Sequence, residues 1–323
     1  MAPAGARRAR SPPSSEAVVR REAPLIVEIL GSRTVVHRYG RDGDPAILAV
    51  HGFRGSHSGL EPLARALSTA GYRVLVPDLP GAGASSPLGG PHDLAGHGRW
   101  LLELAGALAP RLLLGHSFGT VVVASAIARG ATHAGAVLVN PILRPPLDGP
   151  RRIATAAARA YYALAELLPE RHAIRLLGSR AIAAAGGRLM TTTRDPALRR
   201  WIVREHRRQA GAFASRRAVL EAFRASTTST VADFAGAFTR PTLVLGGDRD
   251  PLSPVAACTP EGSGLSEGDF HVFPERGHLL PYEAPWGSAR LIAAWERAGE
   301  RIVPLAPAAP EPSAPARAMP APR

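Results

Sequence analysis

Residues 115–119 read GHSFG, with a serine at the centre of a G-x-S-x-G pattern. The pentapeptide lies between the apolar run Leu112–Leu114 and a second apolar run, Thr120–Ala128, that has the pattern of a helix. A serine on a sharp strand-to-helix turn of this kind presents its hydroxyl at the end of a sheet. Because an unassisted hydroxyl is a weak nucleophile, it needs an adjacent base to accept its proton. The sequence therefore predicts Ser117 as a nucleophile.

An acidic pair and a histidine follow two later apolar runs. The run Thr242–Leu245 ends in GGDRD, and the run Phe270–Phe273 leads to a Gly-His pair at 277–278. Earlier in the chain, Ala46–Val50 ends in HGF, where an oxyanion-hole loop would leave a third strand. Serine, acid and histidine thus come in this order, each just beyond the C-terminal end of a predicted strand. Open parallel sheets place their active sites at those ends, so we expect these side chains to meet.

Five motifs carry a resemblance to a known family. They are HGFRG at 51–55, PDLPGAGAS at 77–85, GHSFG at 115–119, GGDRDPLSP at 246–254 and ERGHLLPYEAP at 275–285. With these motifs in this order, the chain resembles the α/β-hydrolase fold superfamily over roughly residues 25–300. The resemblance implies a mostly parallel central sheet with helices on both faces and an inserted helical cap.

The resemblance also assigns roles to the candidate residues. His278, which follows a glycine at the family's position, would take the proton of Ser117 and return one to the leaving group. Asp248 and Asp250 compete for the role of the acid, and the family pattern G-x-x-D selects Asp250. Some relatives take the acid after the preceding strand, where this chain has Asn140.

Backbone N–H groups are the expected oxyanion hole, because a tetrahedral intermediate needs donors where its negative charge develops. The resemblance places these donors at Phe53 and Phe118. Arg54 could contact an acidic group of the substrate, although a structural or solvent-facing arginine fits equally well. The cap offers aromatic side chains that could line a substrate pocket or belong to its core: Tyr161, Tyr162, Trp201, Phe213 and Phe223.

The periodicity predicts the elements that must position these residues. Leu25–Leu30 and Thr34–Tyr39 flank a turn and predict a hairpin that opens the sheet. Strands and helices then alternate to Asn140, which predicts parallel pairing. The next stretch has only helical patterns, and we expect helices at Pro150–Leu168, Glu170–Ala185, Pro196–Gln209 and Ala212–Ala225.

These patterns divide the chain into five segments. A basic N-terminal tail at 1–23 and a Pro- and Ala-rich tail at 303–323 are expected to be disordered. Residues 24–140 and 239–302 would form the two parts of the hydrolase core, and 141–238 would be the inserted helical cap.

Charge and composition exclude several classes of function. The chain has 323 residues and a formal net charge of +13, but it contains no lysine and its arginines are spread over helices and tails. This pattern is typical of GC-rich codon usage, and no basic stripe with interleaved aromatics predicts nucleic-acid binding. The single cysteine, Cys258, forbids an internal disulfide. We find neither a signal-peptide apolar region nor a run long enough to span a bilayer, so we expect a cytoplasmic protein.

The predicted function is a serine hydrolase that cleaves an ester or related acyl bond of a small, largely hydrophobic substrate through an acyl-enzyme. No H-E-x-x-H pattern or P-loop occurs in the sequence, so we expect neither a metal nor another cofactor. Serine rather than aspartate at position 117 argues against haloalkane dehalogenase and epoxide hydrolase chemistry. The same triad could serve C–C bond hydrolysis, a lyase, a perhydrolase or a cyclising enzyme, and a non-catalytic ligand-binding protein is a third possibility. The oligomeric state is left open.

Overall fold

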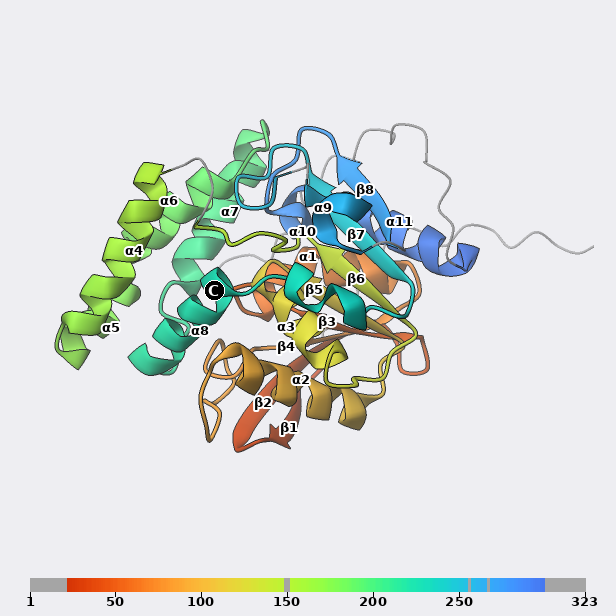
Figure 1. Ribbon diagram of the computed structural model, residues 1–323, viewed down its shortest axis with the longest axis horizontal. Coiled ribbons are helices and arrows are strands. Elements are labelled where there is room, and N and C mark those ends of the chain that lie inside the picture. The colour runs from red at the N-terminus through yellow and green to blue at the C-terminus, as the bar shows by residue number, and fades with distance from the viewer. Residues whose placement is uncertain (1–21, 148–151, 255–256, 266–267, 300–323) are drawn as a thin grey trace, which may run out of the picture.

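A mixed eight-stranded sheet forms the centre of the computed structural model, which describes residues 22–147, 152–254, 257–265 and 268–299 (Figure 1). The strands are β1 (Leu25–Ile29), β2 (Ser32–Tyr39), β3 (Ala46–Val50), β4 (Arg73–Pro77), β5 (Leu112–His116), β6 (Gly135–Val139), β7 (Thr242–Gly247) and β8 (Asp269–Phe273). Their order is β1-β2-β4-β3-β5-β6-β7-β8. The pairs β1–β2 and β2–β4 are antiparallel and all the others are parallel. The predicted tails lie outside the described residues, except for residues 22 and 23.

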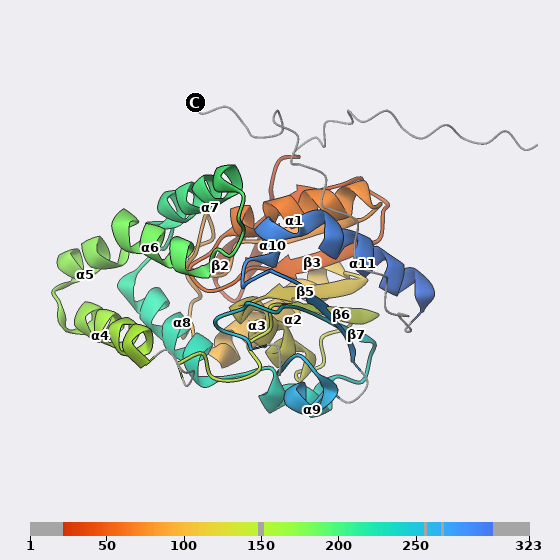
Figure 2. The same ribbon diagram turned by 90° about the horizontal axis from the view of Figure 1, so that it is seen from above.

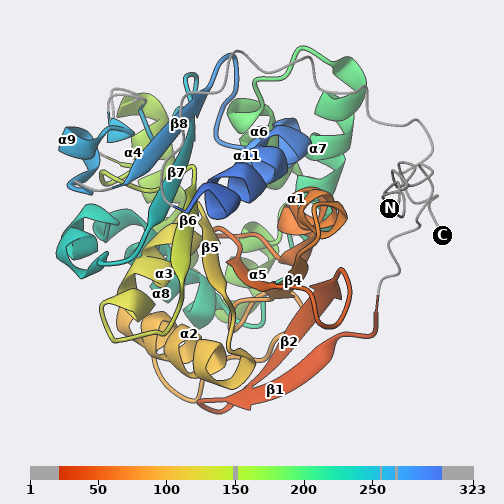
Figure 3. The same cartoon turned by 90° about the vertical axis from the view of Figure 1, so that its right-hand side faces the viewer.

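Helices cover both faces of the sheet, as the sequence predicted. They are α1 (His57–Thr69), α2 (Leu94–Leu108), α3 (Phe118–Ile127), α9 (Pro260–Ser263), α10 (Leu280–Glu283) and α11 (Pro285–Ala298). On β5, Leu113 packs into the hydrophobic cluster of α2 and α3, whereas Leu112 and Leu114 pack into that of α1 and α11. A strand buried on both faces needs apolar residues throughout, which explains the uninterrupted run before the GHSFG motif. Figure 3 shows these two helical layers on opposite sides of the strands.

A block of helices lies between β6 and β7 and projects to one side of the sheet (Figures 1 and 2). We call residues 152–228 the insertion; its helices are α4 (Arg152–Leu167), α5 (Glu170–Leu177), α6 (Arg180–Met190), α7 (Pro196–Gln209) and α8 (Arg216–Thr228), and the short helix η1 (Ala232–Ala237) follows them. The prediction of one helix over Glu170–Ala185 is wrong. Gly178 ends α5, and the side chain of Ser179 accepts a hydrogen bond from the N–H of Ile182 to begin α6.

Backbone hydrogen bonds join the insertion to the loop that follows β4. The N–H of Ala214 donates to the carbonyl of Gly81 at 2.9 Å, and the N–H of Gly83 donates to that of Ala212 at 3.0 Å. This loop leaves the C-terminal end of a central strand, so the insertion lies at the edge of the sheet where the candidate residues were expected. Within the described ranges, no helix is long and apolar enough to cross a membrane.

Asp78 connects three parts of the core just after β4. Its Oδ1 accepts a hydrogen bond at 2.7 Å from the N–H of His57, at the start of α1, and its Oδ2 accepts one at 2.8 Å from the N–H of Ala84. The ring of His57 lies 3.0 Å from Oδ1, and His37 lies 3.6 Å from Oδ2. Burial raises the pKa of the Asp78 carboxyl, but these histidines outweigh it, and the pKa lies well below its usual value.

We expect Asp78→Ala to lower the free energy of unfolding by about 3 kcal/mol, because it removes a buried carboxylate that accepts from two backbone N–H groups and faces two histidines. The pKa of this carboxyl is lower in the folded state than in the unfolded state. Its stabilisation is therefore complete above the ordinary carboxyl pKa of about 4 and is lost as the pH falls below it. Urea unfolding at pH 7 and near pH 3 measures both effects. The difference in free energy of unfolding between the native chain and the variant should be smaller near pH 3. Asp42→Ala, at an exposed ion pair with Arg73, is the control and should change little.

Candidate active site

Ser117 lies on a strained turn between β5 and α3, with φ of +54° and ψ of −124°. Positive φ is unfavourable for a residue with a side chain, so the surrounding contacts must hold it. Both flanking glycines are needed because the backbone approaches them closely. A Cβ on Gly119 would lie 2.2 Å from the carbonyl oxygen of Val50, and one on Gly115 would lie 2.6 Å from that of Gly119. The G-x-S-x-G pattern thus allows α3 to begin against β3, with the serine at the C-terminal edge of the sheet.

Ser117, His278 and Asp250 form one chain of hydrogen bonds. His278 Nε2 lies 2.8 Å from Ser117 Oγ, and His278 Nδ1 lies 2.8 Å from Asp250 Oδ2 and 3.0 Å from Asp250 Oδ1. The carboxylate only accepts, so Nδ1–H donates to it and Nε2 is left to accept the serine proton. His278 is buried, which keeps bulk water away from this chain. The three side chains therefore have the relative positions of a nucleophile, a base and an acid that orients the base.

Asp250 rather than Asp248 faces the histidine. Its Oδ1 accepts hydrogen bonds from the N–H groups of Leu252 at 2.8 Å and Ser253 at 3.0 Å. Burial raises the pKa of the Asp250 carboxyl, but the charge and hydrogen bond of His278 and these backbone donors lower it further, so the net shift is downward. Asp248 is exposed at the end of β7. The structure therefore brings Asp250 to the site as an ionised carboxylate and leaves Asp248 in solvent.

Asn140, the residue after β6, braces both the acid and the histidine loop. It is fully buried and has a positive φ of 46°. Its Nδ2 donates to Asp250 Oδ2 at 2.9 Å and to the carbonyl of Gly277 at 3.0 Å. Its Oδ1 accepts from the N–H of Leu280 at 3.3 Å. The sequence pointed to this position only as an alternative place for an acid, and the side-chain contacts give it a positioning role that the pattern did not reveal.

Two further side chains fix the backbone around the serine. His116 donates from Nε2 to the carbonyl of His278 at 3.0 Å, and burial followed by the charge of His278 lowers the pKa of His116 to about 3, so it stays neutral. Thr120 donates from Oγ1 to the carbonyl of Ser117 at 2.6 Å and accepts from the N–H of Ile142 at 3.3 Å. Both hold the nucleophile turn against the neighbouring loops.

The backbone N–H groups of Phe53 and Phe118 are the donors that the sequence predicts for an oxyanion hole. Among the hydrogen bonds of the described ranges, none uses either of these two donors. His51 braces the loop that carries Phe53, since its Nδ1 lies 2.9 Å from the carbonyl of Gly52 and its Nε2 accepts from the N–H of Leu79 at 3.0 Å. Gly52 itself packs against the nucleophile, because a Cβ there would lie 3.4 Å from Ser117 Oγ. The loop is thus close to the serine and held from behind.

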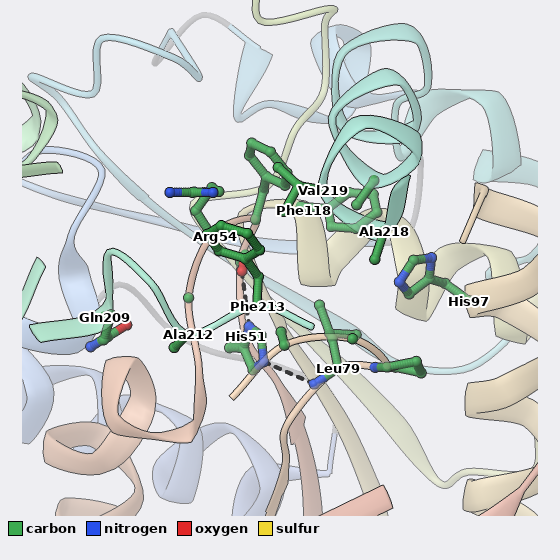
Figure 4. Close-up of a pocket in the computed structure, with 17 residues that line it drawn as sticks. His51, Arg54, Leu79, His97, Phe118, Gln209, Ala212, Phe213, Ala218 and Val219 are labelled. Carbon is green, nitrogen blue, oxygen red and sulfur yellow. Dashed lines mark hydrogen bonds between the residues drawn. The ribbon is translucent and has the colours of Figure 1, made fainter. Parts of the chain in front are cut away.

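A small cavity of about 40 Å³, partly open to solvent, adjoins the loop that carries Phe53 (Figure 4). Gly52 and Phe118 line it beside Ser117, although Ser117 and His278 themselves are not on its wall. None of its 17 lining residues is acidic. The larger apolar residues on its wall are Phe53, Leu79, Phe118, Phe213 and Val219, and the polar ones are His51, Arg54, His97 and Gln209. Burial lowers the pKa of His97 to about 4, so this histidine is neutral. The cavity is therefore mainly apolar.

The predicted pocket residues divide into two groups. Arg54 and Phe213 line the cavity, as described above. Tyr161, Tyr162 and Trp201 are not on its wall. Tyr162 stacks on Phe223 at 3.7 Å between ring centroids, and the hydroxyl of Tyr161 donates to a carbonyl at the end of α5 at 3.0 Å. Trp201 meets the ring of Tyr282 edge to face at 5.2 Å and so packs α7 against the segment after His278.

Arg54 connects the oxyanion loop to the ends of two helices of the insertion. Its guanidinium donates to the carbonyl of Leu177, the last residue of α5, and to that of Ala210, the C-cap of α7, at 3.0 Å. It also lies 5.1 Å above the ring of Phe213. Helix C-termini carry a partial negative charge of about half an electron each, so two of them offset the guanidinium charge without a carboxylate. These contacts are within the protein, which is the structural role that the sequence had left open beside a contact to substrate.

Glu283 fastens a second part of the insertion to the histidine loop. Its carboxylate is buried and accepts from the N–H groups of Thr192 at 2.7 Å, Thr193 at 2.9 Å and Gly277 at 3.2 Å, and from the hydroxyl of Thr192 at 2.6 Å. Gly277 directly precedes His278. The connection between α6 and α7 therefore shares a carboxylate with the loop that carries the candidate base.

Comparisons with known proteins agree with this architecture. The sequence model of the family described as serine aminopeptidase, S33, matches residues 42–284. The chain is similar in structure to a hydrolase from Pseudomonas aeruginosa PA01, with a TM-score of 0.66 and 22% identity over 85% of this chain and 98% of the other. An esterase from Thermogutta terrifontis gives a TM-score of 0.65 and 23% identity over 86% and 99% of the two chains. For an epoxide hydrolase A from Mycobacterium thermoresistibile the TM-score is 0.61, with 21% identity over 86% and 98%. A search of the curated proteins finds no match.

We expect Asn140→Ala to slow the reaction of Ser117 with a fluorophosphonate by about tenfold or more, because the base and its acid lose their shared brace. Asn140→Asp should reduce the labelling rate at least as much, since a second carboxylate beside Asp250 raises the pKa of the pair. Labelling rates measured between pH 5 and pH 9, with folding checked by circular dichroism, test both variants. Asp248→Asn, on the exposed part of the loop that carries Asp250, is the control. If Asn140→Ala labels as fast as the native chain, Asn140 has no positioning role.

Proposed function

The chain belongs to the serine aminopeptidase S33 family of α/β hydrolases, and from this membership and the geometry of the site we propose that it cleaves an ester or related acyl bond with Ser117 as the nucleophile. The observation that carries the proposal is the unbroken hydrogen-bond chain from Ser117 Oγ through His278 to Asp250. Family membership identifies this protein as a hydrolase. The type of bond that it cleaves and the class of its substrate are our proposals.

The proposed reaction begins with attack of Ser117 Oγ on the carbonyl carbon of the substrate while His278 Nε2 takes the hydroxyl proton. The carbonyl oxygen becomes an oxyanion and accepts hydrogen bonds from the N–H groups of Phe53 and Phe118. Asp250 stabilises the imidazolium and keeps the ring in the required tautomer. His278 then protonates the leaving group, and the acyl-enzyme is hydrolysed by water that His278 activates in the same way.

The walls of the cavity support an uncharged acyl substrate. Selection for a peptide's free amino terminus, which the family description suggests, would need a carboxylate to pair with the ammonium group. The cavity wall has no acidic side chain, and Phe53, Leu79 and Phe213 instead offer apolar surface. We therefore propose an ester of a small hydrophobic acid as the substrate class, in preference to an amino-terminal peptide.

Other chemistries are distinguishable by substrate. The chain is similar in fold to an epoxide hydrolase, but the nucleophile position holds Ser117 rather than an aspartate. C–C bond hydrolysis, lyase, perhydrolase and cyclising reactions could use the same three side chains, and a folded protein that labels at Ser117 but leaves all simple esters intact would point to this group. Failure to label at all would favour a binding protein.

Fluorophosphonate labelling read by peptide mass spectrometry tests the proposal directly. We expect the label on Ser117, with none in Ser117→Ala and a rate lower by about three orders of magnitude in His278→Ala. The rates of hydrolysis of p-nitrophenyl esters from acetate to decanoate should fall in the same order, from the native chain to His278→Ala and Ser117→Ala. Ser125→Ala, in the helix α3 that follows Ser117 and outside the hydrogen-bond chain, is the control and should label at the native rate. Labelling at another serine would exclude Ser117 as the nucleophile.

The contacts of Arg54 predict that the insertion helps to position the N–H group of Phe53, a proposed oxyanion-hole donor. We expect Arg54→Met to reduce kcat for an ester by about tenfold to a hundredfold with a smaller change in KM, because the loop next to Phe53 loses its attachment to α5 and α7. Arg54→Lys should recover part of the rate. Arg73→Met, at an exposed ion pair far from the site, is the control. A loss of thermal stability with an unchanged kcat would mean that Arg54 is structural only.

A further inference from the structure

Most of the positive charge of this protein belongs to the insertion. Residues 152–228 contain 15 arginines and five acidic residues, a net charge of +10 out of +13 for the whole chain. The net charge is thus concentrated in one contiguous stretch of the chain. The sheet and its two helical layers lie to one side of this charge (Figures 1 and 2).

The acidic residues of the insertion are already used. Glu166, Glu170, Glu205 and Glu221 each pair with an arginine of the insertion, and Asp195 caps the first turn of α7. Exposed arginines remain on three helices without an ion pair in the described part of the chain. They include Arg171 and Arg175 on α5, Arg188 on α6 and Arg199, Arg200 and Arg204 on α7. Among the described residues, the insertion therefore carries more arginines than carboxylates that pair with them.

Exposed aliphatic side chains lie on the same helices. Of the large hydrophobic side chains that are exposed in the described residues, five of seven belong to α4, α5 and α6. Leu167 is 84% exposed and Leu189 57%, and the other three are Leu164, Ile174 and Ile182. On α5, Ile174 follows Arg171 by three positions and precedes Arg175, so an aliphatic and two guanidinium groups share one stretch of helix surface.

These helices form the outer boundary of the insertion. In both Figure 1 and Figure 2, α4, α5 and α6 occupy the side of the molecule farthest from the strands, with α7 and α8 between them and the sheet. Four of the insertion's aromatic rings, Tyr161, Tyr162, Phe213 and Phe223, are at least partly buried beside the cavity, and Trp201 packs edge to face against Tyr282. The outer side thus combines guanidinium groups and aliphatic side chains, with these four rings unavailable there.

We propose that the outer side of α4, α5 and α6, together with the arginines of α7, docks on a lipid bilayer that carries negatively charged headgroups. Arginine guanidinium groups attract and hydrogen-bond anionic phosphates, and exposed leucine and isoleucine side chains lower their contact with water by entering the boundary between headgroups and acyl chains. A nucleic acid would use the cations but not the aliphatic side chains, and it would call for aromatic rings to stack on single-stranded bases. This peripheral docking needs no membrane-spanning helix, and it does not depend on the proposed reaction.

Vesicle flotation with the full chain tests this docking. We expect the protein to float with vesicles of phosphatidylcholine containing 30% phosphatidylglycerol and to remain unbound with pure phosphatidylcholine. Binding should fall by at least tenfold between low salt and 0.5 M NaCl, because salt screens the attraction between charges. Absence of binding to the anionic vesicles at low salt would overturn the proposal.

Two pairs of matched variants separate this surface from the rest of the protein. Leu167→Ser with Ile174→Ser and, separately, Arg171→Glu with Arg175→Glu should each weaken binding to the anionic vesicles by at least tenfold. Their controls are Ile26→Ser with Leu30→Ser, at the two other exposed aliphatic side chains, and Arg290→Glu with Arg297→Glu on α11. Equal losses in the controls, or binding unaffected by the serine variants, would contradict the proposal. Preferential binding of duplex DNA would assign the charge to a nucleic acid instead.

Discussion

The contact between the turn after β5 and the backbone of β3 is the constraint on which the site depends. Gly119 approaches the carbonyl of Val50 more closely than any residue with a side chain could. This approach begins α3 at the edge of the sheet, forces Ser117 to a positive φ, and places its hydroxyl beside Gly52 in the oxyanion loop. Every other candidate group reaches the serine from a loop that follows another strand of the same sheet. Strain at one residue is thus held by close packing of the strands around it.

Buried carboxylates keep those loops in one arrangement. Asp78 holds the start of α1, Asp250 holds the candidate base with the help of Asn140, and Glu283 joins the histidine loop to the insertion. A buried carboxylate without donors is costly, so each one specifies the position of every backbone N–H group that it accepts from. These junctions are formed by residues far apart in the sequence. They make the geometry of the site depend on several loops at once.

The insertion has two sides with different properties. Its inner side supplies Phe213 and Val219 to an apolar cavity, and the carbonyl ends of α5 and α7 hold Arg54 beside the oxyanion loop. Its outer side has unpaired arginines between exposed aliphatic side chains. The two sides are connected through the same short helices. Binding of a membrane to the outer side would therefore involve α5 and α7, whose C-terminal ends also hold Arg54 beside Phe53.

The sequence alone predicted the fold class, the order of the motifs and most helix and strand positions, because these follow from hydrophobic period and from glycines that permit close backbone approach. It missed the break at Gly178, since local periodicity does not register a change in helix direction, and it did not reveal the contacts of Asn140, Arg54 and Glu283. The family pattern had already selected Asp250 over Asp248. Only the tertiary structure decided which aromatic rings reach the cavity and which arginines and aliphatic side chains are exposed together on the insertion. Such contacts join residues that are distant along the chain, and their distances are set by the packing of the strands and helices between them.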